Sequence, residues 1–254
     1  MTPFFRKIRK TLADDNKPLK YMRYAIGEIV LVVIGILIAL QINNWNEKRN
    51  NAIQELQLLK SCKIGLLKDL SDIDQNIKTH NRSIASVELI LKIIEDNQPY
   101  NDTLSKHFGN VLASTKFFYS TSSFETIKSK GVDLITNITL RNQIIDVYDS
   151  NYTFFLKIDN RQSDEIRRGS TDIFSTRFEE SDKYKILDTE NIQGYIVPLD
   201  FESLKKDQEF LYYLKSLKNK TILFVNFSYS NLRREVVNLI NALQNEINLM
   251  ENIK

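Results

Sequence analysis

Few residues of this chain have the type and spacing that chemistry requires. The sequence has two histidines, His80 and His107, and one cysteine, Cys62, all far apart along the chain. A nucleophile–base pair or a metal site needs several such groups together, and no nearby His or Cys completes a site around His80. We therefore interpret His80 as a core histidine satisfied by a neighbour. One cysteine also excludes an intrachain disulfide.

Motifs that bind nucleotides or activate nucleophiles are missing. The sequence contains no P-loop, no G-x-G-x-x-G, no H-E-x-x-H and no G-x-S-x-G. Acidic residues do occur in pairs, which we interpret as solvated helix faces rather than as an active site. These pairs are Asp69/Asp72, Asp159/Asp164 and Glu179/Glu180. We expect a protein that is not an enzyme, with no catalytic residue, no cofactor and no metal.

Three candidate residues lie inside the longest apolar stretch. Glu28 is ionisable at the edge of this stretch, where it either has an intramembrane role or reaches interfacial water; we favour the interface. Gly35 and Ala39 form a small-xxx-small pair that would let two membrane helices approach closely. Such a contact would give a homodimer.

The stretch itself, YAIGEIVLVVIGILIALQINNW at 24–45, organises the chain. Ile29 to Leu40 is unbroken apolar sequence, and Tyr24 to Ile42 would form about 28 Å of helix at about 1.5 Å per residue. This nearly matches the hydrocarbon core of a bilayer, about 30 Å thick. Tyr24 and Trp45 suit the two interfaces. No A-x-A-like cleavage site follows Leu40, so we predict a retained transmembrane helix.

Charge predicts the orientation of this helix. Residues 1–23 hold seven basic residues against Asp14 and Asp15, whereas residues 43–60 hold three basic residues against Glu47 and Glu55. The positive-inside rule then places 1–23 in the cytoplasm as a basic head and 46–254 across the membrane. The head is either a short helix on the anionic leaflet or a flexible basic segment. The net charge is only +3 and lies mostly in the head, so no nucleic acid is expected as a partner.

Composition and periodicity predict an all-α body. The chain contains only seven Gly and four Pro, the residues that most often interrupt helices. No Gly or Pro lies between Ile42 and the segment that follows, so the helix can continue. Apolar residues then recur at alternating spacings of three and four, broken by His80, until Asn97-Gln98-Pro99 ends the helix. These positions are 70, 73, 77, 80, 84, 87, 91 and 94. The pattern fits a dimeric coiled coil or one wall of an intramolecular bundle, and its width favours the bundle.

Further helices are expected along 46–254. A short helix covers Thr103 to Leu112, and a capping box of Ser122 with Glu125 opens another that stops at Gly131. Asn137 caps a helix that extends toward Phe178, with a bend at Gly169. Residues 179–199 are interpreted as a loop. Asp200 caps the next helix, and a last long seam runs from Val225 to Met250, which together predict an antiparallel bundle.

Two blocks of the sequence carry a family resemblance. The first is R-K-I-R-K followed by Y-A-I-G-E-I-V-L-V-V-I-G-I-L-I-A-L-Q-I-N-N-W-N-E, and the second is F-E-T-I-K-S-K-G-V-D-L-I at 124–135. They resemble an uncharacterised family of single-pass inner-membrane proteins, a domain of unknown function from Bacteroidota and especially flavobacteria. The resemblance implies a periplasm-facing inner-membrane protein and transfers no catalytic residue.

Three functions are compatible with these features. The first is a non-enzymatic scaffold or interaction partner of an envelope complex, with the lipid bilayer and an envelope protein as partners. The second is a ligand sensor that signals through a partner, with a pocket among Phe117, Phe118, Phe124 and Tyr148. The third is an accessory subunit of a proton-driven envelope motor, for which Glu28 would supply the intramembrane acid. A membrane-bound hydrolase is the enzymatic alternative.

Overall fold

The computed structural model of the chain describes residues 18–180, 183–186 and 192–252. The expected basic head lies outside the described residues as far as residue 17. By the packing of its backbone the chain divides into two compact units, Met1–Glu55 and Leu56–Lys254. We call the second the bundle unit. Helices account for almost all of the described secondary structure, which confirms the all-α class.

Helix α2 (Pro18–Glu95) is a single element of 78 residues. It begins at a proline, which is tolerated in a first turn because the N–H groups there have no intrahelical partner. It ends because Asn97 adopts a φ of 51°, which lets the N–H of Gln98 donate to Ile93 O at 3.0 Å. The predicted continuation of the apolar stretch into the next helix, with an end before Pro99, is therefore confirmed.

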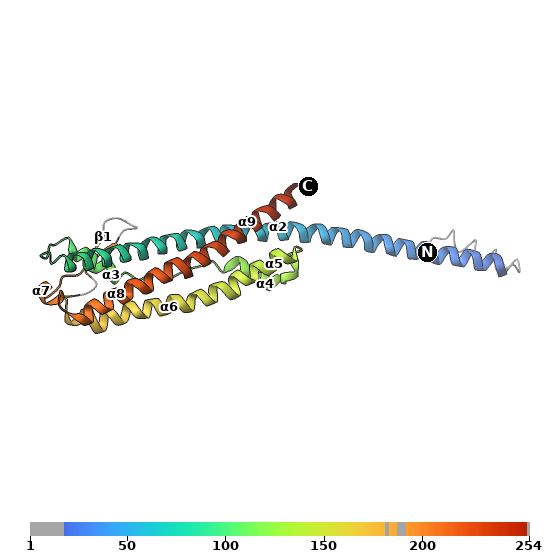
Figure 1. Ribbon diagram of the computed structural model, residues 1–254. Helices are drawn as coiled ribbons and strands as arrows, with labels where there is room; N and C mark the ends of the chain where they lie inside the picture. Colours follow the sequence, from blue (N-terminus) through green and yellow to red (C-terminus); the bar gives the residue numbers. More distant parts are fainter. Residues whose placement is uncertain (1–17, 181–182, 187–191, 253–254) are drawn as a thin grey trace. The chain divides into compact units, whose positions relative to one another are not determined.

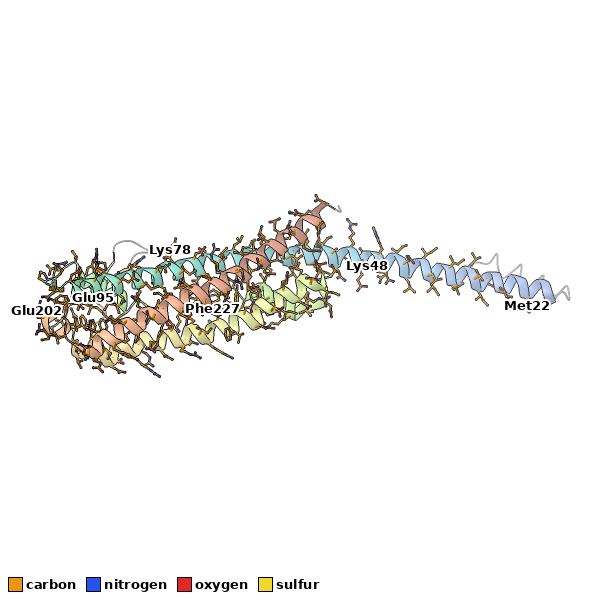
Figure 2. All side chains as sticks on the ribbon, in the orientation of Figure 1. Met22, Lys48, Lys78, Glu95, Glu202 and Phe227 are labelled. Atoms are coloured by element: carbon orange, nitrogen blue, oxygen red, sulfur yellow. The ribbon has the colours of Figure 1, made fainter. Side chains whose placement is uncertain are left out.

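The apolar part of α2 exposes its side chains on every side. We call Ile29–Leu40 the apolar segment; its large side chains are between 45% and 65% exposed. Figure 2 shows side chains projecting all around the helix between Met22 and Lys48. Within the described residues, α2 is the one helix long and apolar enough to span a membrane, by length and composition.

Three long helical runs build the bundle unit (Figure 1). The first is α2 from Leu56. The second comprises α5 (Ile138–Ile145), the π-helical η2 (Asp146–Asn151), α6 (Tyr152–Arg168) and the π-helical η3 (Gly169–Ile173). The third comprises α8 (Gln208–Leu223), the π-helical η5 (Phe224–Tyr229) and α9 (Ser230–Asn252).

Side-chain contacts give the direction of each run. Lys60 pairs with Glu251 at 2.5 Å and Asp74 with Arg233 at 2.7 Å, so α9 is antiparallel to α2 as predicted. The second run is instead parallel to α2, because Tyr152 on α6 reaches Asp69, and Tyr148, four residues earlier, lies against Cys62. A parallel neighbour requires the chain to return along the bundle before α5 begins.

The bend expected at Gly169 is a π-helical turn, η3. A Cβ atom at Gly169 would overlap the phenol of Tyr213 from α8, so the close approach of these two runs requires glycine at this position. The run then closes with the 3-10 turn η4 (Phe174–Thr176).

One end of the bundle unit differs from the sequence prediction. Residues 179–199, expected as a loop, contain the antiparallel strands β1 (Lys183–Ile186) and β2 (Ile192–Tyr195). The hairpin is held on α3 (Leu104–Val111), where Ile196 N donates to Ser105 O at 3.0 Å. Backbone contacts of this kind leave no periodic pattern in the sequence.

Helix capping was predicted with mixed success. Asn137 and Asp200 do cap α5 and α7 (Phe201–Leu204). The capping box at Ser122 is wrong: α4 (Ser122–Lys130) has Thr121 at the N-cap position without a side-chain bond, and Glu125 pairs with Lys128 at 2.7 Å. Asp207 caps α8 separately, so the helix expected from Asp200 is two helices. The 3-10 turn η1 (Val132–Leu134) follows α4.

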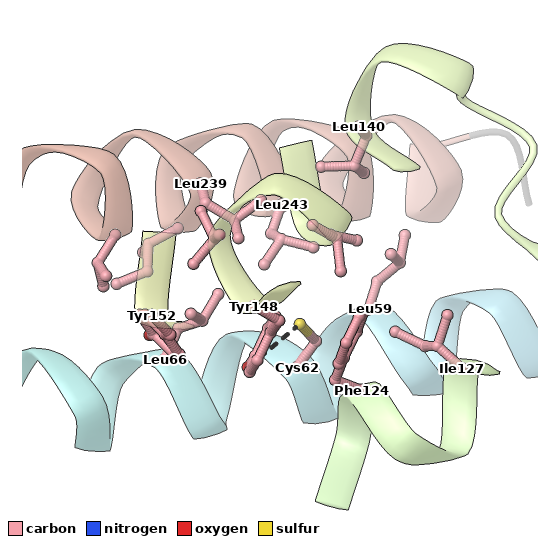
Figure 3. Packing of buried hydrophobic residues seen from close by; sticks show 14 of the residues in the cluster. Leu59, Cys62, Leu66, Phe124, Ile127, Leu140, Tyr148, Tyr152, Leu239 and Leu243 are labelled. Carbon is pink, nitrogen blue, oxygen red and sulfur yellow. Dashed lines mark hydrogen bonds between the residues drawn. The ribbon is translucent and has the colours of Figure 1, made fainter. Parts of the chain in front are cut away.

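Two apolar clusters form the core of the bundle unit, and a polar layer separates them. The first cluster surrounds Leu59, Leu66 and Ile73, and Figure 3 shows part of it. The second surrounds Val87, Phe108 and Phe210. Between them along all three helical runs lie six buried polar residues, which we call the polar layer: Asn76, His80, Ser83, Asp159, Gln162 and Thr221.

Candidate functional site

The most deeply buried line of α2 contains polar residues. The sequence predicted an apolar line through positions 70, 77 and 84, but Leu70, Ile77 and Ile84 are only partly buried. The buried line keeps positions 73, 80 and 87 of the predicted line, replaces 70, 77 and 84 with 69, 76 and 83, and still alternates by three and four. Its members are Leu59, Cys62, Leu66, Asp69, Ile73, Asn76, His80, Ser83, Val87 and Ile90. The polar members mark the candidate site.

An irregular segment, residues 113–121, covers this polar line. We call it the strap; it connects α3 to α4 and has no helix or strand. It runs antiparallel to α2, because Thr115 contacts His80 and Ser120 contacts Asp69. The strap is the return connection that the parallel run from α5 requires.

Side chains of α2 form hydrogen bonds with the backbone of the strap, in place of the backbone hydrogen bonds that a neighbouring strand would provide. Ser120 N donates to Asp69 Oδ1 at 2.7 Å, and Phe118 N donates to Asp72 Oδ2 at 3.2 Å. Asn76 Nδ2 donates to Lys116 O at 3.3 Å. Backbone groups buried without partners would be costly, so these bonds are what allows an extended chain to lie there.

The spacing of these contacts follows from the different rises per residue of an extended chain and of an α-helix. From Thr115 to Ser120 an extended chain advances about 16 Å, at about 3.3 Å per residue. From His80 to Asp69 an α-helix advances about the same distance, at about 1.5 Å per residue. The strap is therefore almost fully extended, and it has little slack between its attachment points.

Asp69 is the central attachment. Its side chain is 1% exposed; besides Ser120 N, it accepts a hydrogen bond from Tyr152 Oη at 2.8 Å. Burial raises the pKa of Asp69 to about 6, although both hydrogen bonds act in the opposite direction. The sequence interpretation of Asp69 as part of a solvated face is wrong, because the strap and Tyr152 cover it.

Two further carboxylates hold the strap. Asp72 also accepts from Asn76 Nδ2 at 2.9 Å, and burial raises its pKa. Asp159, on α6, is 1% exposed and was likewise misread as solvated. Its Oδ2 has no hydrogen-bond partner within the described residues and lies 3.9 Å from Lys116 Nζ of the strap. Burial raises the pKa of Asp159, while Lys116 opposes that shift.

His80 is a core histidine, as the sequence interpretation has it, although its Nδ1 has no hydrogen-bond partner within the described residues. Its Nε2 lies 3.0 Å from Thr115 Oγ1, and its ring contacts Phe224 and Tyr229. Burial lowers its pKa to about 4, so the ring is neutral near pH 7. His107 lies elsewhere, 3.0 Å from Ser86 Oγ. Among the described residues no cluster of His, Cys, Asp or Glu could hold a metal ion.

Cys62 is packed rather than reactive. It is fully buried, its Sγ lies 4.0 Å from Tyr148 Oη (Figure 3), and burial raises its pKa to about 12. A thiol that does not ionise is a poor nucleophile and metal ligand. The aromatic residues considered for a sensor pocket do not form one group: Phe124 stacks on Tyr148 at 4.6 Å between ring centroids, whereas Phe118 is exposed.

The candidates predicted inside the apolar stretch lie outside the bundle unit. Gly35 and Ala39 are exposed, and a Cβ atom at Gly35 would meet nothing within 4 Å. Glu28 is partly exposed. The strap site was missed because its members come from α2, the strap and α6, and only three-dimensional contact relates them.

Comparison with known proteins identifies a family. A family model described as "Family of unknown function (DUF6090)" matches residues 28–197. No curated protein and no solved structure gives a match. The matched region includes the whole apolar segment and the strap. It ends before α7, α8 and α9, although buried residues of α8 and α9 contribute to the two apolar clusters.

Proposed function

We propose that this chain, which belongs to the family of unknown function DUF6090, is a membrane-anchored helical bundle that acts as a non-enzymatic scaffold or interaction partner in a bacterial envelope complex. The apolar segment spans the inner membrane, the head is cytoplasmic and the bundle unit is periplasmic. The resemblance to proteins of Bacteroidota supports this setting.

Exposure of the apolar segment carries the proposal. Ten large aliphatic side chains in succession along one helix, interrupted only by Gly35 and Ala39, are exposed. A helix that is apolar all round is stable in a protein core or in lipid. Because these side chains are all exposed within the described residues, lipid is the solvent that suits the segment. The family match also includes it, which supports an anchor kept in the mature protein.

The chemistry of the strap site supports a non-enzymatic role. Asp69, Asp72 and His80 each hold a part of the strap, and Cys62 is buried with a raised pKa. A catalytic group must reach a substrate, whereas Asp69, His80 and Cys62 are buried in the bundle unit. Their arrangement fits the maintenance of one fold, which a scaffold needs.

The alternatives have less support. A ligand sensor would use the continuity of α2 to transmit a change, but of the aromatic residues expected to line its pocket, Phe124 and Tyr148 stack on each other and Phe118 is exposed. A proton-driven motor subunit would rely on Glu28, at the edge of the span. Replacing Glu28 with Gln would leave the activity of the native complex unchanged under our proposal. Self-association through Gly35 and Ala39 stays a prediction.

Thiol labelling tests the anchor and its orientation. Because native Cys62 is buried, single reporter cysteines can be read against a low background. In intact cells we expect a membrane-impermeant maleimide to label Asn226→Cys in the bundle unit. Thr2→Cys in the head should be labelled only after permeabilisation. Recovery of the protein in the soluble fraction, or labelling of the head in intact cells, would contradict the proposal.

Photo-crosslinking tests the partner. A photoreactive residue at the exposed position Phe227, labelled in Figure 2, would be activated in intact cells. The same residue at the buried position Phe210 is the control. We expect a defined adduct with another envelope protein from Phe227 alone. Adducts of only the protein with itself, under several growth conditions, would argue against the scaffold role.

A further inference from the structure

A hollow of about 130 Å³ lies on the surface of the bundle unit, between the second and third helical runs. Its lining is mostly apolar and comes from η2, α6, η5 and α9. The apolar lining residues and the one charged residue, an acid, are Phe154, Phe155, Ile158, Phe227, Leu232 and Glu235. Two asparagines and a serine complete the lining, so among the described residues it carries one negative charge and no positive charge.

Two phenylalanine rings at this hollow are exposed to solvent. Phe154 on α6 is 65% exposed, and Phe227 on η5, labelled in Figure 2, is 63% exposed. Phe155 and Leu232 are instead buried and belong to the first apolar cluster. A single exposed apolar side chain is ordinary, whereas two exposed rings that flank an apolar hollow form a surface from which another molecule would exclude water.

The third run gives the hollow an apolar end and an acidic end. Phe227 and Glu235 are eight residues apart, which is about two helical turns, or about 12 Å at about 1.5 Å per residue. Leu232 lies between them, and from α6 so does Phe155, whose ring packs on Tyr229 with 4.7 Å between ring centroids. A molecule in the hollow therefore meets aromatic and aliphatic side chains along most of its length and a carboxylate at one end.

The π-helical turn η5 explains why polar residues line this side of the hollow. The buried positions of the third run are spaced by four residues through this turn, at 217, 221, 225 and 229, and continue at 232 and 236. Alternation by three and four from 221 would instead bury 224, 228, 231 and 235, and the last three of these line the hollow. The extra residue of a π turn therefore moves Ser228, Asn231 and Glu235 out of the core. Such turns are frequent at functional sites.

We propose that this hollow is the docking site for the envelope partner, which inserts one apolar side chain between Phe154 and Phe227 and places a lysine or arginine beside Glu235. On a partner helix these two side chains would be one or two turns apart, as anchors of a helix bound in a groove are. The inference rests on the proposed function, because it requires a partner protein.

The size of the hollow limits what enters it. An engineered cavity of about 150 Å³ in another protein holds one benzene molecule, so a hollow of about 130 Å³ suits a single leucine or phenylalanine side chain. Burial of such a side chain beside the rings of Phe154 and Phe227 removes apolar surface of both proteins from water. That removal is the dominant favourable contribution to most protein association.

The charge of the lining favours a basic neighbour for that side chain. Glu235 pairs with Arg234 at 3.3 Å, but both side chains are at least 40% exposed, and an exposed pair contributes little. A cation of the partner would therefore find a carboxylate that its present pair holds only weakly. An acid of the partner would be repelled by Glu235 and would meet no base in the lining.

Photo-crosslinking from several positions in intact cells tests the site. A photoreactive phenylalanine derivative at Phe154 reports on the hollow, and the same derivative at Tyr212 or Leu249, exposed positions outside its lining, reports on other surfaces. We expect Phe154 to give the same adduct as Phe227. The crosslinked peptide of the partner should contain an apolar residue within two helical turns of a lysine or arginine.

The failure of this site and the failure of the proposed function give different results. Adducts from Tyr212 or Leu249 alone would overturn the docking site and leave the proposed function standing, whereas adducts from no position would overturn both. An adduct of Phe154 with a second copy of the chain would overturn the docking site. A partner peptide that lacks the apolar and basic pair would do the same.

Substitutions at the hollow are measured by the yield of the Phe154 adduct. Phe227→Ser should lower the yield about tenfold or more, as expected for an anchoring ring, whereas Tyr212→Ser should leave it unchanged. Glu235→Lys should lower the yield severalfold through charge repulsion. Glu88→Lys, at an exposed position of α2, is the matched control and should not change it.

Two further measurements separate docking from folding. Because the ring of Phe227 is exposed, Phe227→Ser should leave the free energy of unfolding in urea unchanged. Replacement of the partner's basic residue, identified from the crosslinked peptide, by glutamate should restore the adduct to Glu235→Lys. The proposal is overturned if Phe227→Ser leaves the adduct yield unchanged, or if Tyr212→Ser lowers the yield equally.

Discussion

Helix α2 contains two regions in which burial and polarity are related in opposite ways. In the apolar segment, large aliphatic side chains are at least 45% exposed. Between Leu59 and Ile90, the same helix buries Asp69, Asn76, His80 and Ser83. In water, exposure of the aliphatic side chains in the first region would be unfavourable. Burial of the polar side chains in the second region is costly unless each has a hydrogen-bond partner. The difference is the one expected if the first region is the proposed membrane anchor, whereas the second is packed among protein neighbours.

Among these predictions, charged substitutions in the apolar segment should have the largest effect, which is on membrane association. Ile34→Lys with Leu37→Lys puts two cations near the middle of the proposed span, each unfavourable for insertion by about 2.5–3.5 kcal/mol. We expect the double variant to be lost from the membrane fraction in sedimentation and carbonate-wash experiments. Leu223→Lys with Leu249→Lys, at exposed positions of the bundle unit, is the control and should stay membrane-bound. Full retention of the first variant in the membrane fraction would show that the apolar segment is not the part of α2 that holds the protein in the membrane.

The same substitution in both regions should separate packing from solvation. Leu66 is fully buried in the first apolar cluster, so Leu66→Ala should lower the free energy of unfolding of the bundle unit by about 2–5 kcal/mol. Leu37→Ala, in the apolar segment, should leave that free energy unchanged. Urea denaturation of both variants in detergent, followed by circular dichroism, measures the difference. Equal losses would show that the apolar segment also contributes to the packed core.

Local signals explain what could be predicted from the sequence. Asn137 and Asp200 cap helices because their side chains reach N–H groups two or three residues away, and that spacing is visible in the sequence. The apolar segment is evident because every residue in it is apolar. The end of α2 could be predicted from Pro99, which disfavours a helical residue before it, although the helix already ends at Glu95 with Asn97 at positive φ.

The strap site could not be predicted, because its contacts join distant parts of the sequence. Asp69 lies 51 residues from Ser120 and 83 from Tyr152. Reading the apolar line through Leu70 rather than Asp69 was reasonable, since nothing nearby in sequence shows that Asp69 has two donors. The strap, itself without periodicity, and Tyr152 of α6 together make burial of that carboxyl group tolerable. The polar layer was missed for the same reason.

Substitution of two glycines of α2, one in each region, should have the smallest effect and tests how closely the strap packs on the helix. A Cβ atom at Gly65 would lie 3.1 Å from Ser120 Oγ and 3.3 Å from Ser120 Cβ, so Gly65→Ala must displace the strap by a few tenths of an ångström. Alanine also favours a helix over glycine by about 1 kcal/mol, which offsets part of this strain. We therefore expect the global free energy of unfolding to change by less than about 1 kcal/mol, while the amide of Ser120 loses protection in hydrogen exchange. Gly35→Ala has open space around it and should change neither quantity in the bundle unit. If Gly65→Ala left the exchange of Ser120 unchanged, the strap would have more slack than its extended length allows, and the tight fit between the strap and α2 would have to be abandoned.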